Sequence, residues 1–177
     1  MAGWAIFDTA LGACAVAWGE AGIVGAQLPD RDAAALRARM KRRFPEGAEG
    51  APNADATQAI ARIQALLRGE PVDLSGTRID WRGVPEFERR VFEAALSIPP
   101  GRTLTYGDIA QRIGEPGAAR AVGHALGRNP YAPIVPCHRV LAAGGRSGGF
   151  SAPGGISTKL KMLAIEGARV GDEPSLF

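Results

Sequence analysis

The sequence is poor in the residues that build disulfide frameworks and metal clusters. Its 177 residues include only two cysteines, Cys14 and Cys137, and two histidines, His124 and His138. This scarcity argues against a disulfide scaffold and leaves no convincing four-ligand set, so we expect no metal and no cofactor. No apolar run approaches the roughly 20 residues that cross a bilayer, and the first residues lack the basic start of a secretory signal. We therefore expect a cytoplasmic protein without a membrane partner.

Negative charge is scarce over one part of the chain. From Arg102 to Arg169 there are nine Lys and Arg against three Asp and Glu, whereas residues 1–84 carry ten of each. Such a surplus suits a polyanion, although a solvated basic face without a partner explains it equally well. The hydrophobic share of 46% is ample for a globular core of one or two small domains.

The first 84 residues predict a small domain of strands and helices. Apolar runs separated by glycine-rich turns predict an antiparallel sheet with strands over residues 4–7, 13–18 and 23–28. Asp30 is placed to cap a helix that ends in the basic triplet at 41–43, and a second helix is predicted over 56–68. A further strand is predicted over 78–81, and a domain junction near residue 84.

Residues 85–177 predict a mostly helical domain, which makes the fold class α+β. One helix begins at Pro85 and ends before Pro99. Thr105 and Asp108 have capping-box spacing, so a short helix is predicted over 106–113. Another should follow over 118–127. Two short helices joined by a glycine-containing turn are typical of a helix-turn-helix, although many helical hairpins never meet DNA.

The run Pro136-Cys137-His138-Arg139-Val140 places an ionisable thiol beside an imidazole. A thiol attacks as thiolate, and a free cysteine with a pKa of about 8.5 holds little of that form at neutral pH, so a neighbouring base or cation matters. Adjacent residues of an extended segment point to opposite faces, so Cys137 and His138 pair only through a turn or a water. A buried, unreactive cysteine is the alternative.

Several ordered motifs together carry a resemblance to a known family. They are Thr105-Tyr106, Ala118-Ala119-Arg120-Ala121-Val122-Gly123, Arg128-Asn129-Pro130, Pro136-Cys137-His138-Arg139-Val140, and a glycine-rich loop before Glu166-Gly167. In this order they resemble the O6-alkylguanine-DNA alkyltransferases, from about Pro85 to Arg169 and much more loosely over residues 1–84. The resemblance implies direct reversal of DNA alkylation, a methylated-DNA-protein-cysteine S-methyltransferase activity.

The resemblance also implies catalytic roles. Cys137 would take the alkyl group from O6 of guanine irreversibly, so that each molecule acts once. His138 would accept the thiol proton through a water, Glu166 would orient the imidazole, and Asn129 would hold the turn before the active-site segment.

Further residues would bind the DNA. Arg120 would fill the space left by the everted nucleotide, while Ala121 and Gly123 would allow close approach to the minor groove and Arg128 would also contact DNA. The substrate pocket would comprise Tyr106, Pro133, Val140, Phe150 and Ser151. The implied partner is double-stranded DNA that contains O6-alkylguanine, bound by a monomer.

The chain departs from the family pattern at two places. Phe150 stands where tyrosine is common, and about two extra residues follow it before Glu166. His124 replaces a residue that is usually small, and it either contacts phosphate or faces solvent.

Two other functions stay open from the sequence. A non-catalytic protein that binds alkyl lesions would share the scaffold but lack the acceptor cysteine, which is present here as Cys137. A cysteine hydrolase would need an oxyanion site, and the adjacent Cys137 and His138 differ from separated protease dyads.

Overall fold

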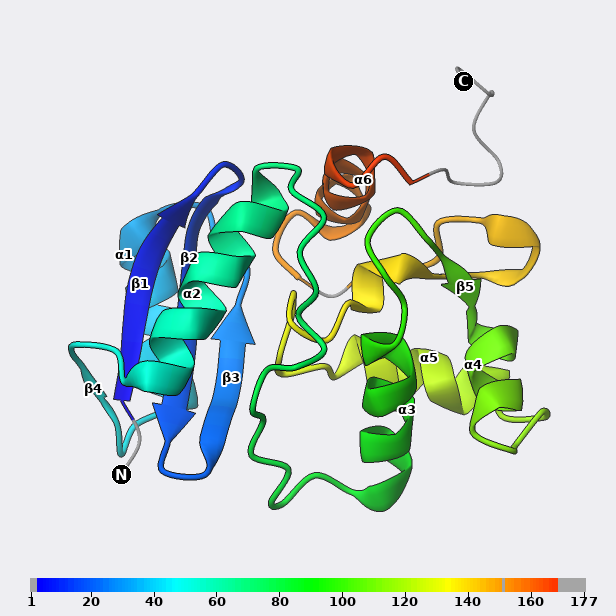
Figure 1. Ribbon diagram of the computed structural model, residues 1–177, viewed down its shortest axis with the longest axis horizontal. Helices are drawn as coiled ribbons and strands as arrows, with labels where there is room; N and C mark the ends of the chain where they lie inside the picture. The colour runs from blue at the N-terminus through cyan, green and yellow to red at the C-terminus, as the bar shows by residue number, and fades with distance from the viewer. Residues whose placement is uncertain (1–2, 151, 169–177) are drawn as a thin grey trace. The chain divides into compact units, whose positions relative to one another are not determined.

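The computed structural model describes residues 3–150 and 152–168 (Figure 1). Its contacts divide the chain into two compact units, Met1–Arg82 with Pro130–Ile134, and Gly83–Asn129 with Val135–Phe177. A folding-domain junction near residue 84 stays a prediction. The sequence did not indicate that the short stretch at 130–134 packs with the N-terminal unit.

A mixed sheet forms the centre of the N-terminal unit. Its strand order is β3-β2-β1-β4, with β1 (Gly3–Thr9), β2 (Gly12–Gly19) and β3 (Gly22–Gln27) antiparallel as predicted. The two-residue strand β4 (Ala48–Glu49) was not predicted, and it pairs with β1 in parallel. The sheet is therefore mixed rather than purely antiparallel. Gly12 and Gly22 begin strands at φ +127°, a conformation that L side chains rarely adopt.

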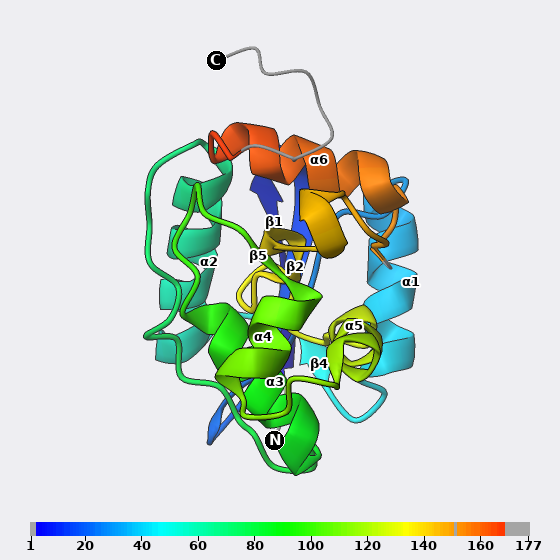
Figure 2. The same cartoon turned by 90° about the vertical axis from the view of Figure 1, so that its right-hand side faces the viewer.

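Two helices cover the opposite faces of this sheet, α1 (Ala33–Arg43) and α2 (Ala54–Leu67) (Figures 1 and 2). Because both faces are covered, β2 is buried along 14–18 instead of alternating. On one face Trp4, Ala15 and Ala17 pack with Leu36 and Met40 of α1. This apolar packing holds α1 on the sheet.

The predicted cap of α1 was wrong by two residues. Asp32 is the N-cap, and its side chain accepts a hydrogen bond from the backbone N–H of Ala35 at 2.7 Å. Asp30 instead accepts from Arg31 N–H and forms an ion pair with Arg39 at 2.7 Å. Both aspartates can cap, and the start of the helix at Ala33 selects the nearer one.

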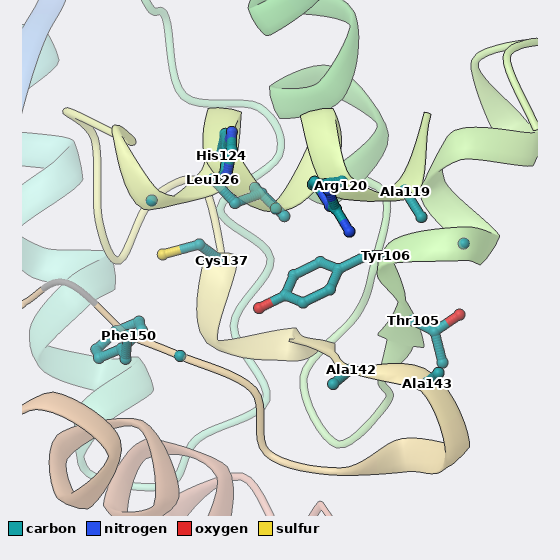
Figure 3. Close-up of a pocket in the computed structure, with 14 residues that line it drawn as sticks. Thr105, Tyr106, Ala119, Arg120, His124, Leu126, Cys137, Ala142, Ala143 and Phe150 are labelled. Atoms are coloured by element: carbon teal, nitrogen blue, oxygen red, sulfur yellow. The ribbon is translucent and has the colours of Figure 1, made fainter. Parts of the chain in front are cut away.

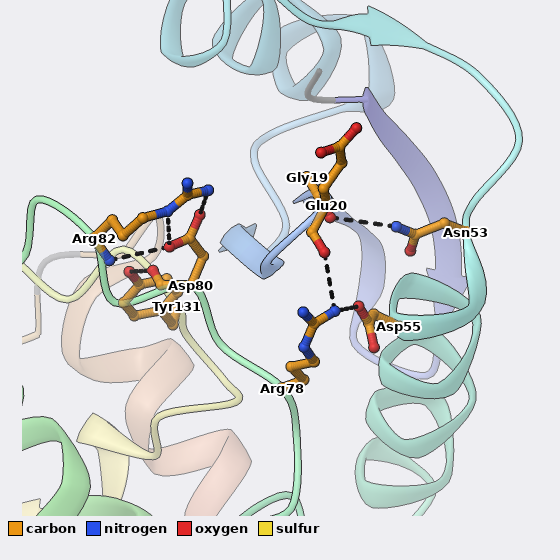
Figure 4. Close-up of polar contacts among 8 residues, drawn as sticks. All are labelled: Gly19, Glu20, Asn53, Asp55, Arg78, Asp80, Arg82 and Tyr131. Atoms are coloured by element: carbon orange, nitrogen blue, oxygen red, sulfur yellow. Dashed lines mark hydrogen bonds and ion pairs between the residues drawn. The ribbon is translucent and has the colours of Figure 1, made fainter.

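The predicted strand over 78–81 is reduced to a single bridge between Ile23 and Ile79. The polar groups around it make loop contacts instead, as Figure 4 shows. Arg78 Nη1 donates to Glu20 O and to Asp55 Oδ2, both at 3.0 Å, and Tyr131 Oη donates to Asp80 O at 3.2 Å. These contacts tie connecting segments to the N-terminal unit.

Arg43, at the end of α1, also donates hydrogen bonds to backbone oxygens of other segments. Its guanidinium donates to Ala26 O at 2.9 Å and to Pro130 O at 3.1 Å, and Ala26 N–H donates to the same Pro130 oxygen. The segment 130–134, which contains a cis peptide bond between Ala132 and Pro133, is thereby fixed in the N-terminal unit.

The C-terminal unit is built on three helices, α3 (Glu86–Leu96), α4 (Tyr106–Arg112) and α5 (Ala119–Gly127), which contact one another. The predicted capping box at the start of α4 is present. Thr105 Oγ1 accepts from Asp108 N–H at 3.0 Å, and Asp108 Oδ2 accepts from Thr105 N–H at 2.8 Å. Helices α4 and α5 with their short turn form the predicted helix-turn-helix arrangement.

Other elements of this unit surround the motif that contains Cys137. Strand β5 (Leu104–Thr105) pairs in parallel with β6 (Val140–Leu141), and two 3-10 turns lie at η1 (Cys137–Arg139) and η2 (Ala143–Gly145). Helix α6 (Gly155–Ile165), for which the sequence analysis made no prediction, contacts η1. Among the described residues, no helix is both long and apolar enough to cross a membrane.

Candidate active site

A cavity of about 960 Å³ opens between α4, α5 and the loop over 142–150. Tyr106 lies in the middle of it, side chains of α5 project from one side, and Cys137 reaches it from η1 (Figure 3). The lining is mostly small or apolar and consists of Thr105, Tyr106, Gly107, Ala119, Arg120, Gly123, His124, Leu126, Gly127, Cys137, Ala142, Ala143, Gly149 and Phe150. The cavity therefore offers a largely apolar lining beside a thiol.

Cys137 lies at the first residue of a 3-10 turn, so the extended segment considered from the sequence is replaced by a turn at this point. Its residue is 9% exposed and lines the cavity. Burial raises the pKa of the thiol, while a hydrogen bond with Asn129 and the nearby charge of Lys159 oppose this shift without outweighing it. The resting group is a neutral thiol that needs a base in order to attack.

Asn129 follows α5 and joins this helix to the segment that contains Cys137. Its Nδ2 donates to Val135 O at 2.9 Å, and its side chain also hydrogen-bonds the Cys137 thiol. The amide thus fixes both the turn and the sulfur.

His138, Arg139 and Glu166 form a buried ionic cluster behind the cysteine. The Glu166 carboxylate is 2% exposed and lies 2.8 Å from His138 Nε2. It also accepts from Arg139 Nε at 2.9 Å and from Nη2 at 2.8 Å, while Arg139 Nη1 donates to Ile98 O at 2.7 Å. The bidentate pair holds the carboxylate rigidly against the imidazole.

This cluster sets the protonation of the imidazole. Burial opposes ionisation of Glu166, but hydrogen bonds and charge from His138 and Arg139 outweigh it and lower its pKa to about 2. Burial lowers the pKa of His138, more strongly than Glu166 raises it. The ring is therefore neutral, and its buried Nδ1 has no hydrogen-bond partner within the described part of the chain. A neutral ring with a free nitrogen can accept a proton.

Lys159 is a site residue that the sequence analysis missed. It is fully buried on α6, where Nζ donates to Val140 O at 2.9 Å and Gly149 O at 3.2 Å and lies 5.9 Å from the centre of the Tyr106 ring. Burial lowers its pKa to about 8, while Cys137 acts in the opposite direction. One signal was available: Lys159 precedes Glu166 by two helical turns, so both lie on one side of α6.

Tyr106 and the glycine-rich loop fit tightly against each other. The Gly149 backbone hydrogen-bonds the Tyr106 hydroxyl, and burial raises the pKa of that phenol. Gly148 has φ +67°, and a Cβ on it would lie 2.8 Å from the same hydroxyl oxygen. Only glycine at 148 therefore leaves the tyrosine where it is.

The residues predicted to bind DNA do not all line the cavity. Arg120 and Gly123 line the cavity, whereas Ala121 is exposed on α5 outside the lining. Arg128 forms an ion pair with Glu88 of α3 at 2.7 Å. Its DNA contact stays a prediction and would require that pair to open or to be shared.

The residues predicted to form the substrate pocket lie in different places, and their contact with a substrate stays a prediction. Tyr106 and Phe150 line the cavity, but Pro133 and Val140 are buried and do not. Pro133 packs with the N-terminal unit, and the Val140 side chain is turned into the core while its carbonyl accepts from Lys159. Ser151 lies outside the described residues.

Comparison with known proteins places this site in a family. Residues 86–168 match the family model described as 6-O-methylguanine DNA methyltransferase, DNA binding domain. The methylated-DNA–protein-cysteine methyltransferase of Mycobacterium bovis is 45% identical over 119 residues, 67% of this chain and 70% of the relative. The corresponding protein of Mycobacterium leprae is 43% identical over 125 residues, 71% of this chain and 73% of that relative.

Solved structures agree with the sequence relatives. The crystal structure of Mycobacterium tuberculosis O6-methylguanine methyltransferase matches with a TM-score of 0.76 at 34% identity, and the match covers 99% of this chain and 96% of that one. A structure from the same organism in complex with DNA matches with a TM-score of 0.74 at 34% identity, over 93% and 92% of the two chains. The chain therefore belongs to the 6-O-methylguanine DNA methyltransferase family.

Proposed function

We propose that this protein repairs alkylated DNA by moving the alkyl group from O6 of guanine to the sulfur of Cys137. The observation that carries the proposal is the thiol at the wall of an open cavity, with a neutral imidazole and its carboxylate partner directly behind it. Membership of a methylated-DNA–protein-cysteine methyltransferase family supports the same reaction. The alternative of a non-catalytic lesion-binding protein lacks support, because the acceptor thiol is present.

The reaction needs two proton transfers and one displacement. His138 Nδ1 takes the Cys137 proton through a water, and Glu166 balances the charge that forms on the imidazole. The thiolate attacks the alkyl carbon, a carbon–sulfur bond forms, and the bond to O6 breaks with its electron pair leaving on the guanine. The guanine anion then gains a proton and the His138 imidazolium loses the one that it took from the thiol, so that the base and the imidazole are both neutral again. The product thioether has no easy hydrolytic exit, so each molecule turns over once.

The lesion must leave the duplex before sulfur can reach it. Extrusion of a base costs a few kcal/mol, and a side chain that fills the gap offsets part of that cost. Arg120 lines the cavity on α5 and is long enough for this role. Gly123 has no side chain, so the minor groove of the DNA can approach the helix closely at this position. We propose that the protein acts as a monomer on double-stranded DNA.

Stoichiometric transfer tests the proposal directly. The protein is incubated with duplex DNA that carries a radiolabelled methyl group on O6 of one guanine. We expect one label per protein molecule, found on the peptide with Cys137, and restored guanine in the DNA. Tight binding without transfer would instead indicate a lesion sensor, and repeated turnover would indicate a hydrolase.

Arg120→Ala should separate base extrusion from chemistry. We expect repair of duplex DNA to slow at least about tenfold, because the extruded state loses a stabilising side chain. Reaction with free O6-benzylguanine, which needs no extrusion, should lose much less. The ratio of the two rate constants is the measurement, and equal losses on both substrates would contradict the role of Arg120.

Gly148→Ala should disturb the cavity from the loop side. A left-handed backbone costs a non-glycine residue about 1–2 kcal/mol, and the added Cβ also displaces the Tyr106 hydroxyl. We expect lower thermal stability and slower transfer. Gly50→Ala is the control, since Gly50 has open space around its Cβ position. Equal behaviour of the two variants would show that the loop adapts freely.

A further inference from the structure

His124 is the one histidine that the proposed reaction does not use. It lies on α5, is exposed, and lines the cavity together with Arg120, four residues before it (Figure 3). Residues four apart are neighbours on one helix face. The imidazole therefore occupies the same DNA-facing side of α5 that Arg120 occupies in the proposed function.

We infer that His124 is a second DNA-binding residue, and that its protonated imidazole donates a hydrogen bond to a phosphate oxygen of the bound strand. The inference rests on the proposed binding of DNA by α5. The contact depends on protonation of the imidazole. Arg120 cannot supply such a pH-dependent contact, because a guanidinium stays charged.

The surroundings of His124 favour an anion from outside the protein. Within the described residues, the lining of the cavity holds no carboxylate, and its other titratable groups are Arg120, Tyr106 and Cys137. The Lys159 ammonium adds positive charge behind the Tyr106 ring. An imidazolium here therefore has no acidic partner in the cavity, and a phosphodiester would provide one.

The charged groups of the helices packed on α5 are mostly engaged elsewhere. On α4, Asp108 accepts from Thr105 N–H and Arg112 donates to Ser97. On α3 the pairs are Glu88 with Arg128, Glu93 with Arg89 and Arg90 with Glu115, while Glu86 is exposed in the first turn. These carboxylates are committed or lie outside the cavity lining, so they do not compete for the imidazolium.

Because the proposed contact needs a protonated imidazole, it can be tested by changing the pH. A neutral imidazole has one N–H donor, whereas the imidazolium has two and a positive charge. The chain has only one other histidine, His138. That ring is buried against Glu166 and lies outside the cavity lining, and burial lowers its pKa. Lys159, whose pKa burial lowers to about 8, also gains charge below that pH, so only the part of a pH-dependent gain in DNA affinity that His124→Gln removes is assigned to His124.

The experiment measures binding of undamaged duplex DNA, so that chemistry at Cys137 does not enter. Dissociation constants are determined over a range of salt concentrations at about pH 6 and about pH 8 for the wild type, His124→Gln, His124→Lys and Arg120→Ala. Each phosphate contact contributes about 0.9 to the slope of log affinity against log salt. Glutamine and lysine are both good helix formers at an exposed site, so these variants should fold.

We expect the wild-type slope to be steeper by close to one contact at the lower pH, with affinity at least about threefold higher. His124→Gln should lose this pH dependence and keep the shallow slope, and His124→Lys should keep the steep slope at both pH values. A wild type with the same slope and affinity at both pH values would overturn the inference. If Arg120→Ala also binds normally, the proposed DNA-binding face of α5 fails as well, which separates the two failures.

Discussion

Cys137→Ser is expected to abolish alkyl transfer while lesion binding is retained. A serine hydroxyl is a far weaker nucleophile than a thiolate, and loss of a nucleophile lowers rates by about a thousandfold or more. The substitution changes one atom at a 9% exposed position, so the cavity keeps its shape. The measurement is the fraction of labelled methyl groups found on protein after incubation with excess protein, beside the affinity for the same duplex.

Cys14 provides the matched control for this result. It is 1% exposed in β2, and burial raises its pKa to about 12, so it holds almost no thiolate at neutral pH. Cys14→Ala should therefore transfer alkyl groups like the wild type, with a modest loss of stability from its core position. Label that persists on the Cys137→Ser protein, or disappears from the Cys14→Ala protein, would refute the assignment of the acceptor.

Glu166→Gln is expected to weaken both the fold and the reaction. The carboxylate accepts three hydrogen bonds from His138 and Arg139, and a glutamine amide would place N–H donors against those donors. Removal of one partner from a buried ion pair costs about 3–5 kcal/mol. Transfer should slow on the order of 10²-fold, because the imidazole loses the group that orients and balances it. Chemical denaturation and single-turnover rates measure the two effects.

An exposed ion pair supplies the control for stability. Glu49 pairs with Arg37 at 2.8 Å, but both side chains are more than 40% exposed. Such pairs contribute less than about 1 kcal/mol, so Glu49→Gln should be nearly neutral. A similar loss of stability in both variants would mean that burial does not strengthen the contribution of the Glu166 cluster.

The same carboxylate gives a signed pH dependence. The pKa of Glu166 is lowered from 4.5 to about 2 in the folded state, so its stabilisation is complete above the unfolded pKa and is lost as pH falls toward 2. The shift corresponds to about 3 kcal/mol. The free energy of unfolding of the wild type should fall by about that much more than that of Glu166→Gln between about pH 5 and pH 2. If the free energy of unfolding changed with pH in the same way for both proteins, the lowered pKa of Glu166 would be contradicted.

Local patterns in the sequence were enough for most helices and strands. Apolar runs separated by glycine-rich turns located β1 to β3, and the Thr105–Asp108 spacing located the start of α4 to the residue. The cap of α1 was misplaced because Asp30 and Asp32 are chemically equivalent candidates. Strand β4 and the β5–β6 ladder were missed because two-residue strands depend on a partner that lies far away in the chain.

The proposed acceptor site was visible in the sequence as residue types in order. Cys137, His138, Asn129 and Glu166 were named from motifs, and the structure brings them together. Arg139 was named only as part of the motif around Cys137, although it holds the Glu166 carboxylate with two hydrogen bonds. Lys159 was missed because its one signal, a spacing of two helical turns before Glu166, depends on α6, which the sequence analysis did not predict.

The amino-acid sequence by itself determined the chemistry of this protein, since a thiol, an imidazole and a carboxylate carry their reactivity in their covalent structure. Only the tertiary structure decided the protonation states and the positions of these groups. Burial makes the thiol and the imidazole neutral, the ion pair with Arg139 keeps Glu166 ionised, and the packing of Pro133 and Val140 keeps their side chains out of the cavity. Desolvation and packing arise from residues distant in the chain, and no local pattern records them.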